Sequence, residues 1–182
     1  MLKKTVFAGF GGQGVLMMGY LYAVAAMREG KEVTYLPSYG AEMRGGTANC
    51  TIAVSDEEIF SPVASSPDHA VILNNPSLIK FESALTRGGL IVLNSSLVDR
   101  KTSRDDITVY RVPANELAKK HFNDDRSVNI IMLGGFIAAT KMTSIESIVK
   151  ALHEIFKGKK SDIMAINEKS LTLGAELVIK GA

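Results

Sequence analysis

The chain has 182 residues, a length typical of one domain, and it can bury a substantial core without disulfides or metal ions. Lys and Arg number 21 and Asp and Glu number 19, and the resulting net charge of +2 is too small for the broad positive field of a nucleic-acid binder. We therefore expect one domain over residues 1–182 and no nucleic-acid partner.

Cysteine content and hydropathy restrict the possible functions further. Cys50 is the one cysteine, so the chain forms no internal disulfide and does not supply the four thiolates that an iron–sulfur cluster usually needs. The N-terminus has only a short apolar stretch before its glycines, and no apolar run approaches the roughly 20 residues that span a bilayer. We expect a cytoplasmic protein with no membrane partner, and any electron carrier must lie on another chain.

The N-terminal half begins with alternating β-prone and helical segments. Residues 3–8 form a β-prone run that ends at glycines, residues 13–29 have apolar side chains at helical spacing, and residues 32–36 form a second β-prone run that Pro37 stops. Strand, helix and strand in this order predict a parallel βαβ unit. After a stretch rich in glycine, the β-branched residues of 50–55 favour a third strand.

Dense apolar runs occupy the middle of the chain. Residues 69–74 and 90–94 suit central strands covered on both faces, and the segment between them predicts a crossover helix that starts at Pro76 and stops at Gly88. Residues 107–112 predict another strand, and helical spacing dominates from Pro113 onward. The predicted fold class is α/β, a three-layer Rossmann-like domain with a mostly parallel sheet and a helical C-terminal third.

One strongly apolar segment and one strongly charged segment stand out in the second half of the chain. Residues 129–139 are apolar around most of a helix, which indicates either full burial in the domain or docking against another subunit. The charged residues of 99–106 are typical of a solvated surface loop.

The turn after the first strand carries a glycine pattern with a possible ligand. Gly9, Gly11 and Gly14 have the GxGxxG spacing between a strand and a helix, and the free N–H groups of such a helix bind phosphate or carboxylate. The glycines can equally serve close packing of the helix on the strand. NAD or FAD is the weakest alternative, because Pro37 and Ser38 stand where a dinucleotide site has an acidic residue.

A second glycine-containing loop follows the second strand. It combines Ser38, Tyr39, Glu42, Arg44 and Asn49 with three glycines, a mixture poor for regular structure but rich in hydrogen-bonding groups. We expect it at the carboxyl edge of the sheet, in one cleft with the first turn. Arg44 there either clamps an anion or is paired with Glu42.

Five segments together carry a resemblance to a known family. GFGGQGV, SYGAEMRGGT, CTIAVSD, RGGLIVLNSS and NIIMLGG resemble the gamma subunit, or gamma domain, of the pyruvate/2-oxoglutarate ferredoxin or flavodoxin oxidoreductases, over nearly the whole chain. The resemblance implies an oxidative decarboxylation in which a 2-oxoacid, coenzyme A and an oxidised ferredoxin or flavodoxin give acyl-CoA and carbon dioxide. It also implies that thiamine diphosphate lies between alpha and beta subunits and that iron–sulfur clusters lie on beta and delta components.

The resemblance assigns the two loops to the site of that complex, and no catalytic residue to this chain. Both loops are expected to face the assembled active site, and coenzyme A is a candidate ligand because its phosphates suit a helix N-terminus and an arginine. The matching residues are Gly11, Gly12, Gln13 and Gly14 in the first loop and Tyr39, Gly40, Glu42, Arg44, Gly45 and Gly46 in the second.

The sequence leaves alternatives open for both the 2-oxoacid substrate and the class of function. A separate short gamma chain resembles the 2-oxoglutarate synthase type, while pyruvate and branched-chain acids stay open. A free-standing nucleotide-binding or regulatory module is the main alternative. An NAD-dependent oxidoreductase is disfavoured because the sequence has no evident proton-transfer dyad.

The remaining candidate residues have structural interpretations. His69, His121 and His153 are far apart in sequence and lack metal-ligand spacing, so we expect surface or capping histidines and no bound metal. Cys50 at a strand start is interpreted as a small buried hydrophobic residue rather than a nucleophile.

Overall fold

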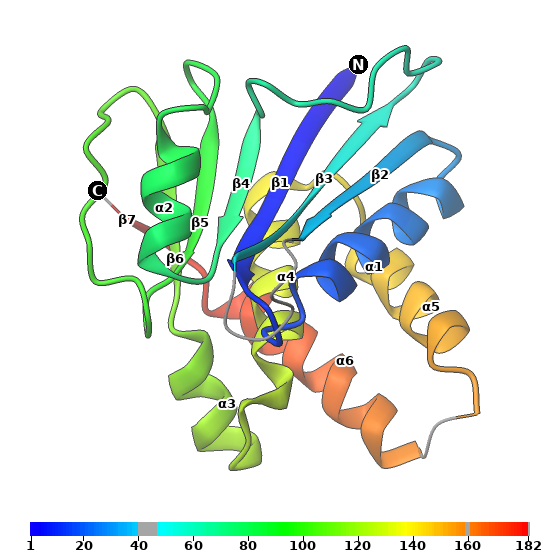
Figure 1. Ribbon diagram of the computed structural model, residues 1–182. Coiled ribbons are helices and arrows are strands. Elements are labelled where there is room, and N and C mark those ends of the chain that lie inside the picture. The colour runs from blue at the N-terminus through cyan, green and yellow to red at the C-terminus, as the bar shows by residue number, and fades with distance from the viewer. Residues whose placement is uncertain (40–46, 159–160, 182) are drawn as a thin grey trace.

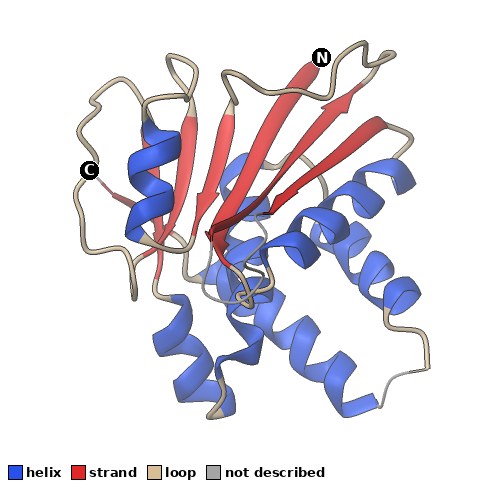
Figure 2. Ribbon diagram, viewed as in Figure 1, coloured by secondary structure: helices blue, strands red, loops and turns tan. Residues whose placement is uncertain are grey.

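A computed structural model describes residues 1–39, 47–158 and 161–181, and Figures 1 and 2 show its course. The described strands are β1 (Leu2–Phe10), β2 (Glu32–Tyr39), β3 (Thr47–Ser55), β4 (His69–Ile72), β5 (Leu90–Asn94), β6 (Thr108–Val112) and β7 (Ile179–Gly181). The helices are α1 (Val15–Arg28), α2 (Asn75–Glu82), α3 (Ala114–Phe122), the 3-10 turn η1 (Asp125–Ser127), α4 (Val128–Thr140), α5 (Ile145–Ile155) and α6 (Ser161–Glu176).

The strands form one seven-stranded sheet in the order β2-β3-β1-β4-β5-β6-β7. β1, β4, β5 and β6 pair in parallel, whereas β3 is antiparallel to both β1 and β2, and β7 is antiparallel to β6. Five of the seven strands therefore point in one direction, which confirms the mostly parallel α/β sheet. β4 and β5 lie inside it, as the sequence predicted.

The predicted parallel βαβ unit is present, because β1 and β2 run in the same direction and α1 connects them. The two strands are not neighbours, however: β3 lies between them and pairs with β1 from Leu2–Ser55 to Phe10–Thr47. β3 is apolar enough for this interior place, with Ile52, Ala53 and Val54 fully buried.

Helices cover both faces of the sheet, which gives the three expected layers (Figure 2). Alternate side chains of β1 supply both cores: Phe7 joins the large core beneath α1, α4 and α5, while Val6 and Ala8 pack with Leu78 of α2 on the other face. α2 begins at Asn75 with the Asn74 side chain as its cap and ends at Glu82, so the prediction that it continues to Gly88 is wrong.

The apolar segment 129–139 is buried inside this chain, within α4. Its glycines allow α6 to cross closely: a Cβ on Gly134 would lie 2.0 Å from the Leu171 carbonyl oxygen, and one on Gly174 would lie 1.8 Å from that of Ile131. Such distances exclude any side chain at either position. Of the two alternatives for this segment, burial in the chain itself is confirmed.

The C-terminal third is helical as predicted, except for the short strand β7, which the sequence analysis missed. The charged loop 99–106 is partly fixed rather than wholly solvated. The buried carboxylate of Glu82 accepts hydrogen bonds from the backbone N–H groups of Ser103 and Arg104, and the Arg104 side chain pairs with Asp106. Among the residues that the structure describes, no helix is long and apolar enough to cross a membrane.

Candidate functional site

The first glycine turn joins the end of β1 to the start of α1 and is closed by its own side chain. The Gln13 N–H donates to the Phe10 carbonyl oxygen at 3.2 Å, and the Gln13 Oε1 accepts from the Phe10 N–H at 2.6 Å. Gly12 and Gly14 have backbone φ angles of 95° and 73°, values that residues with a side chain rarely adopt. Gln13, one of the predicted ligand residues, therefore uses its side-chain oxygen to stabilise the turn.

The N-terminus of α1 is open to the outside of this turn. Gly14 is the N-cap and contributes no side-chain acceptor, so the first N–H groups of a 14-residue helix keep their hydrogen-bonding capacity. They carry the positive end of the helix dipole, as an anion site requires.

The second loop starts and ends at the same edge of the sheet as the glycine turn. Tyr39, the last residue of β2, pairs with Ala48, and Thr47, the first residue of β3, pairs with Phe10 beside the turn. The predicted proximity of the two loops is thus confirmed for the ends of the second one. Gly40, Glu42, Arg44, Gly45 and Gly46 lie outside the described residues.

A cavity of about 280 Å³ opens beside the glycine turn. Four parts of the chain enclose it: the turn, α3, η1 and the N-terminal residues of α4. Its lining consists of Gly12, Gln13, Gly14, Asn115, Asp125, Arg126, Val128 and Asn129. The sequence analysis did not identify the lining residues of α3, η1 and α4, because they lie about a hundred residues after the glycines. The one local signal for them is the polar stretch 123–127 between two helical segments.

A chain of amides fixes the floor of this region. The buried Asn94 at the end of β5 donates from Nδ2 to Asn115 Oδ1 at 2.8 Å, and Asn115 donates from Nδ2 to Asp125 Oδ1 at 3.2 Å. Asn129 of α4 donates from Nδ2 to the Gly14 carbonyl oxygen at 3.4 Å. Side-chain amides therefore link β5 to α3 and η1 and, in a separate hydrogen bond, α4 to the turn.

Arg126 supplies the cation at the cavity. Its Nε pairs with Asp124, and the Arg126 backbone N–H and guanidinium together hold the pKa of the Asp124 carboxyl below its usual range. The Arg126 side chain is 91 % exposed, so it can turn toward a ligand at little cost. An incoming anion competes with Asp124 for this guanidinium.

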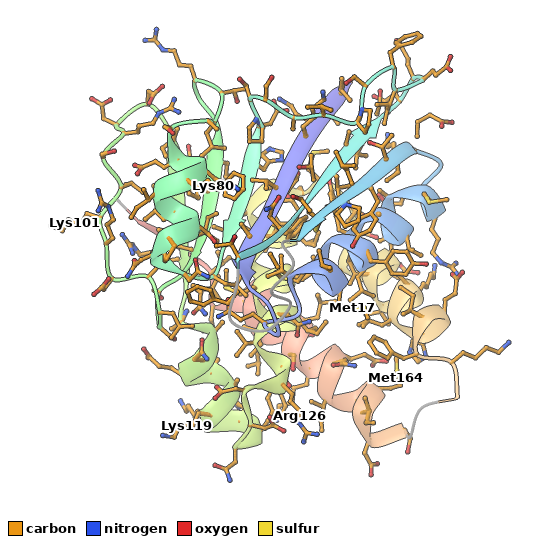
Figure 3. All side chains as sticks on the ribbon, in the orientation of Figure 1. Met17, Lys80, Lys101, Lys119, Arg126 and Met164 are labelled. Atoms are coloured by element: carbon orange, nitrogen blue, oxygen red, sulfur yellow. The ribbon has the colours of Figure 1, made fainter. Side chains whose placement is uncertain are left out.

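A second, mainly apolar pocket of about 310 Å³ adjoins the first and shares Arg126 and Asn129 with it. Figure 3 shows Met17 and Arg126 on the helical side, below the sheet. The apolar lining comes from Met17, Phe122, Ile130, Phe156, Ile163 and Ile166. Together the two cavities form a cleft with a polar end at the glycine turn and an apolar end among the helices, which suits an elongated ligand with an anionic group.

The cysteine and the histidines are not among the residues that line this cleft. Burial raises the pKa of the Cys50 thiol to about 12, and its Sγ lies 3.7 Å from the Val15 carbonyl oxygen, which confirms a packing role. His121 and His153 are exposed, as expected. His69 is a correction: it is half-buried, lies against Phe136 and has Nδ1 3.3 Å from Thr5 Oγ1, and burial lowers its pKa to about 4. Among the described residues, no three His, Cys, Asp or Glu side chains are placed to hold a metal ion.

Comparison with known proteins matches residues 4–177 to the family model described as pyruvate ferredoxin/flavodoxin oxidoreductase. The ketoisovalerate oxidoreductase subunit VorA of Methanothermobacter marburgensis is 39% identical over 95% of this chain, which spans only 36% of that relative. The 2-oxoglutarate synthase subunit KorC of Methanocaldococcus jannaschii is 32% identical over 97% of this chain and 96% of its own length.

The structures agree with the sequences. The gamma subunit of a keto/oxoacid ferredoxin oxidoreductase from Geobacter sulfurreducens PCA superposes with a TM-score of 0.84 at 26% identity, over 97% of this chain and 96% of that one. With a family model matching most of its length and a relative above 30% identity covered almost end to end, this chain belongs to the pyruvate ferredoxin/flavodoxin oxidoreductase family.

Proposed function

We propose that this chain is the gamma-type subunit of a thiamine-dependent 2-oxoacid:ferredoxin or flavodoxin oxidoreductase. The complex converts a 2-oxoacid and coenzyme A to acyl-CoA and carbon dioxide while it reduces its electron acceptor. The observation that carries the proposal is the match to KorC, which extends over 97% of this chain and 96% of that subunit.

The chain acts with alpha and beta subunits, and with a delta subunit where one is present. Thiamine diphosphate and the iron–sulfur clusters lie on those partners, and the chain is inactive alone. The described residues support this division of labour, since the cleft offers hydrogen-bond donors and a guanidinium, and the lone thiol is buried with a raised pKa.

The role of this chain is to hold coenzyme A at the glycine turn. The open N-terminus of α1 and the guanidinium of Arg126 suit its phosphates, and the apolar pocket beside them suits an uncharged part of the molecule. Gly11, Gly12 and Gly14 allow close approach of the backbone, and Tyr39, Glu42, Arg44, Gly45 and Gly46 of the second loop complete the site.

The substrate is 2-oxoglutarate, because three KorC subunits match this chain along nearly their whole lengths. Ketoisovalerate is a second candidate on a separate observation: VorA subunits are more nearly identical, at 39–40%, although the chain spans only 36% of them. Sequence identity favours ketoisovalerate, whereas the extent of the match favours 2-oxoglutarate, so both acids must be assayed side by side.

The test is to isolate the tagged chain from its native cells without oxygen and to identify what copurifies. The preparation is then assayed for coenzyme-A-dependent viologen reduction with 2-oxoglutarate, ketoisovalerate and pyruvate. Large thiamine- and iron–sulfur-containing subunits together with 2-oxoglutarate oxidation support the proposal. A chain that purifies alone and binds a nucleotide tightly would instead identify a free-standing nucleotide-binding module.

A further inference from the structure

Asp125 of η1 places a carboxylate in the cavity beside the glycine turn. Among the described residues that line this cavity it is the only acidic one, whereas the open N-terminus of α1 and the Arg126 guanidinium offer hydrogen-bond donors alone. A carboxylate repels phosphate, so a site for phosphate alone would have no use for it. The combination suits a ligand that carries a hydroxyl or N–H group close to its phosphates.

Hydrogen bonds from the sheet hold this carboxylate in place. Asn94, which is fully buried at the end of β5, donates from Nδ2 to Asn115 Oδ1 at 2.8 Å, and Asn115 donates from its own Nδ2 to Asp125 Oδ1 at 3.2 Å. Within residues 1–39, 47–158 and 161–181, the second carboxylate oxygen of Asp125 accepts no hydrogen bond and forms no ion pair. That oxygen keeps its capacity to accept a hydrogen bond from a ligand.

Dinucleotide-binding domains combine the same two features, a glycine turn for the pyrophosphate and a carboxylate for a hydroxyl of the neighbouring ribose. In those domains the carboxylate follows the second strand, a place that Pro37 and Ser38 occupy in this chain. Here the carboxylate comes from η1, between α3 and α4, and lines the same cavity as Gly12 and Gly14. A hydroxyl group beside a pyrophosphate is therefore the donor that this arrangement suits.

Coenzyme A has a hydroxyl on each side of its pyrophosphate, one on the ribose and one on the pantothenate arm. The ribose hydroxyl is next to the ribose phosphate, which a carboxylate repels. Dinucleotide sites that accept a ribose phosphate have an arginine near it. The pantothenate hydroxyl has no charged neighbour of this kind and is the better donor for Asp125.

Arg126 and the apolar pocket suit the other half of the coenzyme. Arg126 lines both cavities, so it lies where the polar cavity meets the pocket that contains Phe122 and Phe156. In coenzyme A the ribose with its phosphate lies between the pyrophosphate and the adenine, and aromatic side chains are common stacking partners of bases. With the pantothenate arm at Asp125, the ribose phosphate therefore reaches Arg126 and the adenine enters the apolar pocket.

We propose that Asp125 accepts a hydrogen bond from the pantothenate hydroxyl of coenzyme A and thereby sets the direction in which the coenzyme lies in the cleft. The pyrophosphate lies at the N-terminus of α1 and the adenine in the apolar pocket. The thiol end leaves the cleft on the side of the glycine turn, which is expected to face the partner subunits. The inference rests on the proposed function, which supplies the coenzyme.

The test measures how tightly the assembled enzyme binds coenzyme A and dephospho-coenzyme A, which lacks the ribose phosphate. Dissociation constants are obtained by titration calorimetry for complexes that contain the wild-type, Asp125→Ala or Arg126→Gln chain. Asp125→Ala should weaken both ligands by the same factor, about tenfold, because both lose a charged hydrogen bond to the same hydroxyl. Arg126→Gln should weaken coenzyme A by about tenfold and dephospho-coenzyme A much less.

A kinetic measurement separates a binding role of Asp125 from a structural one. Asp125→Ala should raise the KM for coenzyme A while kcat and the KM for the 2-oxoacid stay as in wild type, because the carboxylate does not touch the reacting thiol. Asp125→Asn keeps the size of the side chain and one acceptor oxygen, so it should weaken coenzyme A by only about threefold. Thermal melting of each isolated chain checks that the fold is intact.

Asp162 provides the matched control, because it is an exposed carboxylate in the first turn of α6 that lines neither cavity. Asp162→Ala removes the same charge and should leave both dissociation constants unchanged.

Three results would overturn the inference. They are unchanged dissociation constants in Asp125→Ala, an equal loss in Asp162→Ala, and a loss in Asp125→Ala that is confined to dephospho-coenzyme A. The last of these would place the carboxylate beside the ribose. A wild-type complex that binds neither ligand, or an Arg126→Gln complex that binds both as wild type does, is a different failure, since it contradicts the proposed coenzyme site itself.

Discussion

Asn129 and Gly14 are 115 residues apart in sequence, yet the Asn129 Nδ2 donates a hydrogen bond to the Gly14 carbonyl oxygen at 3.4 Å. A Cβ on Gly14 would lie 2.4 Å from the same nitrogen. The start of α4 therefore sets the position of the glycine turn and leaves no room for a side chain at Gly14. Because Gly14 and Asn129 both line the cavity, a shift of α4 would move the turn and change the cavity together.

Gly14→Ala should destabilise the chain for two reasons, the positive φ and the contact with Asn129. The matched control is Gly12→Ala, where φ is also positive but nothing lies within 4 Å. The control should lose about 1–2 kcal/mol of unfolding free energy from the backbone alone. Gly14→Ala should lose roughly 1–3 kcal/mol more, measured by urea unfolding. Equal losses would mean that Asn129 does not restrict the turn.

The crossing of α4 and α6 gives a second stability prediction. Gly134→Ala should cost about 3 kcal/mol or prevent folding, because the helices must move apart to admit one methyl group. Gly158→Ala, whose added Cβ meets nothing within 4 Å, should cost only the backbone term of about 1–2 kcal/mol. The measurement is chemical denaturation of both variants. A Gly134→Ala chain as stable as wild type would show that this crossing is looser than described.

His69 should make stability depend on pH in mildly acidic solution. Burial lowers its pKa from 6.5 to about 4, with the charge of Asp68 opposing and that of Lys3 adding to the shift. The unfolded chain therefore binds the proton more readily, and stability falls as pH drops from about 6.5 toward 4. We expect a loss of roughly 2–3 kcal/mol over this window.

His69→Gln should flatten this part of the profile, which is followed by urea unfolding between pH 4 and 7. His121→Gln, at an exposed position, is the control and should leave the slope as in wild type. A slope that persists in His69→Gln would assign the pH dependence to other groups.

Cys50 should be unreactive in the folded chain. Its thiol is buried and its pKa is raised to about 12, so almost no thiolate is present at pH 8. A disulfide reagent should label it slowly in the native state and rapidly once the chain is unfolded in urea. Fast labelling of the native chain would contradict the packing role.

Arg126→Gln in the assembled enzyme should raise the KM for coenzyme A by about tenfold or more, because a charged hydrogen bond to phosphate is lost. The KM for the 2-oxoacid should change little. Arg100→Gln, at an exposed position in the loop after β5, is the control. An unchanged KM for coenzyme A would place its phosphates away from Arg126.

The sequence predicted the classes of element well, and the neighbours of each strand less well. Period and composition identified the central strands and the helical C-terminal third, because each is long or strongly apolar. They do not show which strands pair, so the insertion of β3 between β1 and β2 was missed. The three residues of β7 are too few for any periodicity to appear.

The candidate site shows the same division. The glycine turn was found because its spacing is local, and both loops begin at one sheet edge because β2 runs in the direction of β1. Asn115, Arg126 and Asn129 were not found, since they approach the turn only through packing of α3 and α4. Burial of His69 between Thr5 and Phe136 is likewise a tertiary effect that its neighbours in sequence do not indicate.

The most direct test of the central claim is reconstitution of the enzyme with and without this chain. The partner subunits are prepared without it, and coenzyme-A-dependent viologen reduction by 2-oxoglutarate is measured before and after the purified chain is added. We predict little activity from the partners alone and recovery on addition of one equivalent of wild-type chain. Full activity without the chain, or none after its addition, would contradict its assignment as a gamma-type subunit of a 2-oxoacid oxidoreductase.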